Sequence, residues 1–502
     1  MTGCKEPLGS MNRIFQKLSW GIGCILALNA QAQNEIDILR YSYQESLGSA
    51  RYMAMGGAFG ALGADLSCLT GNPGGIGMYR RGDAGITTGL ASQKTKLNIE
   101  SQFGNANQLS GSTTNLGLAL SYPSVNPDWP VTTLAITHSR RANYNEKLSI
   151  EDAPLSASLL DAFLSSAQGI PSSDLYDMAP FTSNLAWETY LLDPHPNNDP
   201  TAYISAIPYG GAYATKTIER SGRLNETNIG MGSGFRERIF VGGTFGIVNV
   251  IFEETAIHEE RPRIDSLMLN EWEFQELLQI EGSGINLKAG LTWMASSWLR
   301  MGLAYHTRSR ITLNDDYSTK IRSAFKDGSN YDYNSPPNRL EYVIYTPARM
   351  LASAAFILGK AGIISADVER VNYGSGTLNP TALSGANAYD FAAENEAAQT
   401  LYTISYAARV GAEFRIQRAW RVRFGGGMET SPFSPAAEVQ SDANRYQASS
   451  GIGYRLENWS VALTYRRSWF ERDIYLFSPD LLGAGSMGHS HGMMVFSAGF
   501  RL

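Results

Sequence analysis

The sequence predicts an all-β protein: a transmembrane antiparallel β-barrel of about fourteen strands with an N-terminal hatch (plug) containing short helices. Two observations predict it. The chain opens with a secretory signal but has no later apolar run long enough for a membrane helix, and its C-terminal two thirds alternate apolar and polar side chains. We expect three regions: upstream residues and signal peptide over 1–32, the hatch over 33–82, and the barrel with long extracellular loops over 83–502.

The N-terminus has the features of a secretory signal peptide. Two basic residues precede the apolar run 18–28, and Ala30-Gln31-Ala32 forms an A-x-A cleavage site. The run is shorter than the roughly 20 apolar residues that a membrane helix needs. We therefore expect a mature chain that begins near Gln33 and retains one cysteine, Cys68, which excludes an internal disulfide framework.

Composition narrows the class of protein. The net charge is −6 and 18% of the residues are charged, so no basic field favours a nucleic-acid partner. Glycine accounts for 50 of the 502 residues and tyrosine for 25, and the mean hydropathy is −0.20. These values do not suit a helical membrane protein, whereas they suit a β-rich one.

The alternation identifies individual strands. In the segment 404–416, for example, Val410 and Phe414 face one side while Arg409 and Glu413 face the other. Very short turns separate the strands on one side and long polar loops on the other, as in outer-membrane barrels. Because bacterial barrels have an even number of strands, we expect one of the first two candidates to be wrong. The candidates are 83–91, 94–103, 114–122, 131–140, 227–235, 238–252, 284–294, 299–312, 341–357, 362–373, 404–416, 419–428, 447–456, 459–471 and 493–502.

Two loops show helical rather than strand periodicity. In 152–192, Leu155, Leu159 and Phe163 recur every four residues, and in 266–280 apolar residues cover a broad helical face. We expect helices in both loops. They would either pack on the barrel rim or offer an apolar landing surface for ligands.

Four charged residues fall on inward-facing positions of two neighbouring strands. They are Arg409, Glu413, Arg421 and Arg423, and we expect them to form a polar lining of the lumen, where charge is tolerated. The sequence leaves open whether they pair with one another on a solvated face or contact a ligand.

Motifs for catalysis and nucleotide binding are not found. The glycine-rich stretch 57–63 reads G-x-x-G-x-x-G instead of G-x-G-x-x-G, no Walker-type lysine follows it, and there is no G-x-S-x-G elbow. The histidines are scattered. His489 and His491 are expected in a solvated loop before the last strand, although on a strand both rings would share a face. We therefore expect no enzyme activity, no cofactor and no metal site.

The region before the first strand candidate carries a recognisable pattern. It reads GSARYMAMGGAFGALGAD over 48–65, followed by Asn72-Pro73-Gly74-Gly75. This resembles the FadL family of outer-membrane transporters for hydrophobic compounds, in which a GGA…D…NPAG pattern precedes the first barrel strand, and the similarity continues along most of the chain. Gly74 stands where that family usually has alanine, a change expected to loosen the backbone. No residues match the family's ligand pocket.

The resemblance implies a hatch inside a fourteen-stranded barrel in the outer membrane of a Gram-negative bacterium. It also implies passive uptake of long-chain fatty acids or other hydrophobic small molecules by a monomer surrounded by outer-membrane lipid and lipopolysaccharide. Asn72, Pro73, Gly74 and Gly75 would then be hatch or gating residues. Two alternatives stay open: a non-specific porin, and a structural or adhesive barrel that uses its long loops for contact.

Overall fold

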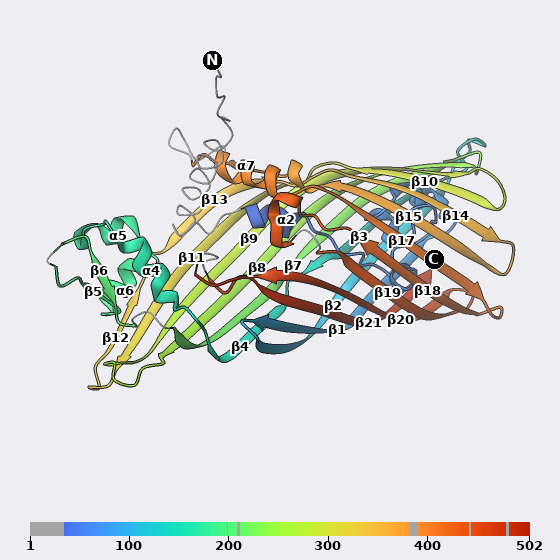
Figure 1. The fold of residues 1–502 in the computed structure, drawn as a ribbon. Helices are drawn as coiled ribbons and strands as arrows, with labels where there is room; N and C mark the ends of the chain where they lie inside the picture. The colour runs from blue at the N-terminus through green and yellow to red at the C-terminus, as the bar shows by residue number, and fades with distance from the viewer. Residues whose placement is uncertain (1–34, 198, 208–210, 382–388, 441–442, 478–480) are drawn as a thin grey trace, which may run out of the picture.

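The computed structural model describes residues 35–502 except 198, 208–210, 382–388, 441–442 and 478–480; the signal peptide predicted over residues 1–32 lies outside the described residues. The chain forms a closed antiparallel β-barrel (Figure 1). Closure is made by the first and last strands, β1 (Asp83–Ile99) and β21 (Gly485–Arg501), which pair from Asp83↔Arg501 to Asn98↔Ser486. The all-β fold class is confirmed.

The wall contains fourteen strands, as the sequence predicts. Four of them are interrupted, so that each carries two labels. These are β3 (Val131–Asn143) with β4 (Glu146–Pro154), β10 (Leu299–His306) with β11 (Arg310–Phe325), β14 (Arg349–Leu358) with β13 (Asn338–Tyr345), and β15 (Gly362–Asn372) with β16 (Thr377–Pro380). The other wall strands besides β1 and β21 are β2 (Gln102–Pro123), β7 (Ala212–Phe235), β8 (Ile239–Pro262), β9 (Leu269–Met294), β17 (Ile404–Arg415), β18 (Trp420–Glu429), β19 (Arg445–Arg455) and β20 (Trp459–Ile474).

The two ends of the barrel differ. One end, the turn end, has short connections such as 236–238, 295–298 and 456–458. The other, the loop end, carries helices and small strands (Figure 1). These are α4 (Leu159–Ala167), η4 (Ser172–Asp174), α5 (Leu175–Met178), α6 (Ser183–Glu188), β5 (Leu192–Pro194), β6 (Tyr203–Ser205) and β12 (Asn330–Asn334). Nearer the middle of the barrel lie η5 (Tyr373–Ser375), in the break between β15 and β16, and α7 (Ala392–Leu401) and η6 (Pro435–Gln440), which pack together. The helices expected in 152–192 are therefore present.

The second predicted loop helix is wrong. Residues 269–294 form the single strand β9, the longest in the wall at 26 residues. The pairing with β11 shifts by one residue between Ala324↔Glu271 and Phe325↔Leu269, so the strand has a β-bulge there. The bulge brings Leu269 and Trp272 to the same buried face, and the resulting spacing of three resembles a helical period.

Two further differences concern strand positions. The weak candidates 83–91 and 94–103 are largely one strand, β1, so the even count is kept. His489 and His491, expected in a loop, lie on β21. In both places the sequence is rich in polar and small residues, which weakens the apolar signal without preventing sheet pairing.

The wall has an apolar outer face and a polar or small-residue inner face. On β10, Met301, Leu303 and Tyr305 point outward and are exposed, while Gly302 and Ala304 are buried inside. At the turn end, aromatic pairs mark the edge of the apolar belt, as in the aromatic girdles of outer-membrane barrels. They are Trp129–Phe235, Trp298–Phe356, Trp420–Tyr454 and Trp459–Phe500, with ring centroids 4.7–6.1 Å apart.

None of the helices in the described part of the chain has the length and apolar composition needed to cross a membrane.

The outward position of Leu303 allows a direct test of the lipid-facing belt. Leu303→Arg should destabilise the barrel in lipid vesicles by about 2–4 kcal/mol, because the charge would enter hydrocarbon. Val125→Arg, at a fully exposed position in the turn 124–130, should cost far less. The measurement is denaturant unfolding in vesicles, and equal losses for the two variants would contradict the placement of β10.

Candidate functional site: the plug inside the barrel

Residues 35–82, called the plug below, lie inside the barrel and contain four short helices. They are α2 (Glu35–Ser42), α3 (Ala50–Ala54), η2 (Leu66–Leu69) and η3 (Pro73–Met78). Three of them begin at a side-chain cap: Ser49 accepts from Tyr52 N, Asp65 from Ser67 N, and Asn72 from Gly74 N. Such caps satisfy helix N–H groups that have no partner in so short a helix.

The Asn72-Pro73-Gly74-Gly75 turn is fixed to the wall through its asparagine. Asn72 Nδ2 donates to Gly60 O (2.6 Å) within the plug, and to Leu291 O (2.9 Å) and Thr292 Oγ1 (3.3 Å) on β9. Its Oδ1 accepts from Gly74 N at 3.0 Å. Asn72 is buried, so each of these bonds replaces one to water, and removing the side chain would leave several backbone groups unpaired.

The two glycines of this turn provide space. Neither has a positive φ. A Cβ on Gly74 would lie 2.8 Å from the β9 backbone at Leu291 C and Thr292 N, and one on Gly75 would lie 2.7 Å from Cys68 Sγ. The expectation that Gly74 loosens the turn therefore does not describe this structure: glycine here permits close contact between two backbones.

The wall strands that face this part of the plug also carry glycines at the points of contact. Gly232 on β7, Gly242 on β8, Gly290 on β9 and Gly302 on β10 would each place a Cβ within 2.0–2.6 Å of a plug atom. These four positions, named the glycine cradle, lie on consecutive wall strands. Ordinary side chains in the cradle would push the plug away from the wall.

On the side away from the glycine cradle, ion pairs hold the plug to the wall. Glu413, on β17, accepts from Arg51 of α3 (Nε–Oε2, 2.9 Å) and from Arg423 of β18 (2.7 Å). All three side chains are largely buried. Two of the predicted lumen residues, Glu413 and Arg423, are thus brought together, and their partner Arg51 comes from the plug.

A second ion-pair group lies on neighbouring strands. Glu369 of β15 bridges Arg349 and Arg409, with N–O distances of 2.7 Å to each, and Arg349 also donates to Ser42 O of the plug. The predicted lumen residue Arg409 is therefore paired. Glu369 was not identified from the sequence. The signal was available, because Glu369 lies two residues after the inward-facing Asp367 on the same strand, and alternate residues of a strand share a face.

Asp367 was missed as well. Its Oδ2 accepts from both Phe59 N and Gly60 N at 2.9 Å, so one carboxylate oxygen fixes the middle of the plug to β15. An inward acidic residue on a lumen-facing strand was the available signal, but the plug atoms that it binds could not be identified from the sequence.

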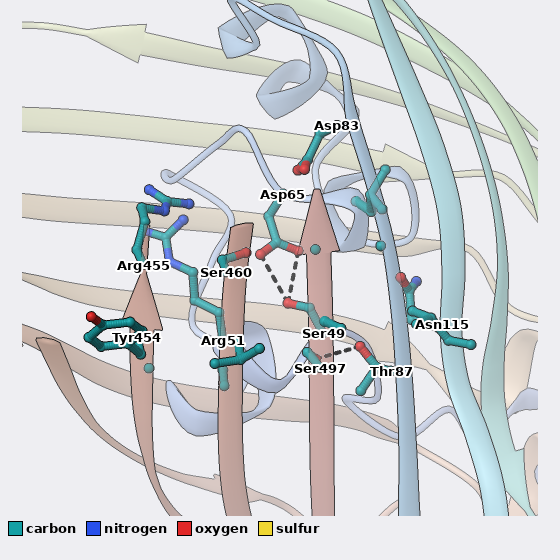
Figure 2. Close-up of a pocket in the computed structure, with 18 of the residues that line it drawn as sticks. Ser49, Arg51, Asp65, Asp83, Thr87, Asn115, Tyr454, Arg455, Ser460 and Ser497 are labelled. Atoms are coloured by element: carbon teal, nitrogen blue, oxygen red, sulfur yellow. Dashed lines mark hydrogen bonds between the residues drawn. The ribbon is translucent and has the colours of Figure 1, made fainter. Parts of the chain in front are cut away.

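The fourth predicted residue, Arg421, lines a polar cavity of about 100 Å³ between plug and wall (Figure 2). Arg51, Asp65, Asp83 and Arg455 also line it. In Figure 2, Ser49 Oγ is bonded to Asp65 within this cavity, at 2.9 Å from each carboxylate oxygen. A volume of this size holds several waters, so this side of the plug is suited to hydration.

The wall opens beside the plug. β2 and β3 pair from Pro123↔Val131 up to Asn115↔Ser139, and beyond that point β2 residues 102–113 pair only with β1 among the described residues. The plug covers the free edge of β3 from inside, where Glu45 N donates to Arg141 O at 2.7 Å. We name this position the wall gap.

Outside the wall gap lies a groove of about 820 Å³. Its floor includes the outward-facing apolar side chains of Leu90, Met494 and Phe496. Arg140 and Arg223 form part of its polar rim. The groove thus joins an apolar surface to a polar edge, which suits an amphiphilic molecule.

Toward the loop end the lumen is apolar and is filled by α2. Ile38 and Tyr41 of this helix are fully buried and pack in one cluster with Phe252, Tyr342 and Phe391. Asp37 Oδ2 accepts from Tyr342 Oη at 3.0 Å, which orients the helix. Figure 1 shows α2 beside α7, midway along the barrel.

Comparison with known proteins gives a consistent class. No family model and no curated sequence matches the chain. Among solved structures, the Pseudomonas putida toluene transporter TodX aligns with a TM-score of 0.55 at 11% identity, covering 91% of this chain and 99% of that one. A Pseudomonas aeruginosa FadL homologue gives 0.53 at 12% over 91% and 99%, and the Ralstonia pickettii toluene transporter TbuX gives 0.50 at 13% over the same shares.

The chain is thus an outer-membrane-type β-barrel with an internal plug. More particularly, it has the fold of the FadL-type transporters of hydrophobic compounds, along nearly the whole length of those proteins.

The glycine cradle can be tested with adjacent residues. Gly242→Ala puts a Cβ 2.1 Å from Pro73 O, whereas Gly243 has no atom nearer than 3.8 Å. Cys68 reports the outcome, because it is buried in the plug and burial raises the pKa of its thiol to about 12. Overpacking costs about 1–3 kcal/mol, so Gly242→Ala should speed maleimide labelling of Cys68 by roughly tenfold or more. Gly243→Ala should label at the unaltered rate, and faster labelling of both would refute the cradle.

Proposed function

We propose that this protein is a channel for passive uptake of hydrophobic small molecules across the outer membrane of a Gram-negative bacterium, with long-chain fatty acids as its substrates. The observation that carries the proposal is the order of surfaces along the barrel. An apolar cluster filled by α2 lies toward the loop end, the rest of the plug follows, and the wall gap beside the plug faces an apolar groove. The toluene transporters of the same fold support hydrophobic cargo in general.

The physical argument concerns water. A fatty acid gains about 0.8 kcal/mol for each buried CH₂, so it gains little from an aqueous pore and much from an apolar path. The cluster around Phe252, Tyr342 and Phe391 offers such surface to a ligand that displaces Ile38 and Tyr41 of α2. Entry into this part of the lumen then requires that ligand binding offset the loss of the α2 contacts, without an external energy source.

Gating is assigned to the plug. Its two sides are held differently, by backbone contact in the glycine cradle and by ion pairs at Glu413 and Glu369. Arg51 and Arg423, the partners of Glu413, line the cavity of about 100 Å³, so water there can replace their ion pairs when the plug moves, whereas close-packed backbone contacts have no such replacement. We therefore propose that the plug pivots on the Asn72–Gly75 turn while its charged side separates from the wall.

Substrate class is tested with purified barrel in detergent. Labelled long-chain fatty acid should bind saturably, an aromatic hydrocarbon should compete, and sugars should neither bind nor compete. Haem serves as a bulky amphiphilic control. Conductance of small hydrophilic solutes without fatty-acid binding would instead establish a porin, and loop-dependent adhesion without binding would establish an adhesive barrel.

Gating is tested at Asn72. Asn72→Ala removes the bonds to Gly60, Leu291 and Thr292, which should weaken seating of the turn by about 1–3 kcal/mol and reduce fatty-acid uptake by cells several-fold. Asn126→Ala, in an exposed turn, is the matched control. Unchanged uptake by correctly inserted Asn72→Ala would remove the gating role while leaving the transport proposal intact.

A further inference from the structure

The final wall strand carries a symmetric pattern of inward-facing residues. Along β21 the sequence reads Met487-Gly-His489-Ser-His491-Gly-Met493. Alternate residues of a strand share a face, so both histidines and both methionines point into the barrel. Met487, His491 and Met493 are buried, and only small residues separate the four.

The imidazole nitrogens have few partners. His489 Nδ1 and Nε2 and His491 Nε2 are enclosed and have no hydrogen-bond partner among the described residues. A buried polar atom without a partner costs about 1–3 kcal/mol, and here three such atoms occur on two neighbouring inward positions. A ligand that accepts nitrogen lone pairs would remove this cost.

We propose that His489 and His491 form a copper(I) site, completed by the thioether of Met487 or Met493. Two histidines at i and i+2 lie about 6.6 Å apart along a strand, and their rings can lean toward one ion. Imidazole suits copper, and thioether sulfur selects its monovalent state. The site lies beside the wall gap, because Glu45 contacts both Arg141 and His491, but copper binding does not depend on the proposed transport function.

The ligand count discriminates among metals. The described residues contain no group of three or more His, Cys, Asp and Glu side chains arranged to hold a metal ion. A structural zinc ion takes four such ligands, whereas copper(I) accepts fewer ligands and soft sulfur. A site of two imidazoles and one thioether therefore favours copper(I) over zinc.

Three arginines lie near the two histidines, and one of them, Arg445, stacks 4.1 Å over the Phe470 ring. These positive charges disfavour a divalent ion more than a monovalent one. The adjacent Arg466 and Arg472 are each paired with a carboxylate, Arg466 with Glu45 (3.6 Å) and Arg472 with Glu146 (3.4 Å). Glu45 Oε2 also lies 3.8 Å from His491 Nδ1, so the carboxylate is on the Nδ1 side of the ring and Nε2 is left to the metal.

Apolar contacts complete the enclosure. The ring of Phe470 on β20 meets His489 edge-on, with centroids 4.5 Å apart. Met487 packs with Leu97 of β1 and Leu148 of β4. An apolar shell restricts solvent access, which favours the lower charge of copper(I) over copper(II).

The test uses the purified full-length barrel, with ascorbate as reductant and bicinchoninate as the coloured copper(I) competitor. The unaltered protein should remove one equivalent of copper(I) from the chelator, and zinc should not displace it. His489→Ala and His491→Ala should each weaken binding by roughly 100-fold or more, since even loss of an outer partner of a ligand commonly costs ~10–100-fold. Gel mobility of the closed barrel checks folding.

Matched controls come from the outer face. His138→Ala on β3 and Met494→Leu on β21 alter exposed residues of the same types and should leave binding unchanged. One of Met487→Leu and Met493→Leu should weaken it, and X-ray absorption should show both nitrogen and sulfur neighbours. The proposal is overturned if folded His489→Ala/His491→Ala protein retains full copper(I) affinity, or if zinc binds equally well.

Discussion

The structure depends on one constraint: in a bilayer every backbone N–H and C=O group of the wall needs a partner within the protein. Pairing of β1 with β21 meets it by closing the sheet. Where the wall is interrupted, other groups take over. Arg308, on the outer side between β10 and β11, donates to Tyr345 O, Thr346 O and Ser375 O at 3.1–3.4 Å, so one guanidinium satisfies carbonyls of two neighbouring breaks.

The same constraint explains why the plug is part of the wall's hydrogen bonding. At the wall gap the free edge of β3 is met by the plug through Glu45 N and Arg141 O, and Thr114 Oγ1 of β2 donates to Gly48 O at 3.0 Å. When the plug moves, these wall groups lose their hydrogen-bond partners in the plug, and water or a ligand must replace them. Opening of the lumen and exposure of the wall gap are therefore coupled, because the same segment covers both.

The alternation of side chains between the two faces of a strand explains what could be predicted from the sequence. It identified the closed barrel and assigned Arg409, Glu413 and Arg423 to the inner face, since side-chain direction in a strand is a local property. It failed at Leu269 and Trp272, where the β-bulge changes the parity. It could not supply the partners of these charges: Arg51 and Glu413 are 362 residues apart in sequence, and only closure of the barrel brings them together.

The glycines show most clearly how the structure changes an interpretation. From sequence, Asn72-Pro73-Gly74-Gly75 suggested a flexible turn, yet Gly74 and Gly75 have ordinary backbone angles and touch β9 and Cys68. Flexibility within the turn would not help passage, because the cradle glycines hold the turn and the plug residues beside it against four wall strands. Motion is easier where the plug is held by a side chain beside a cavity large enough for water, at Arg51, whose partner is Glu413. The turn therefore serves as the fixed point about which the proposed gate would move, and the charged side as the part that opens.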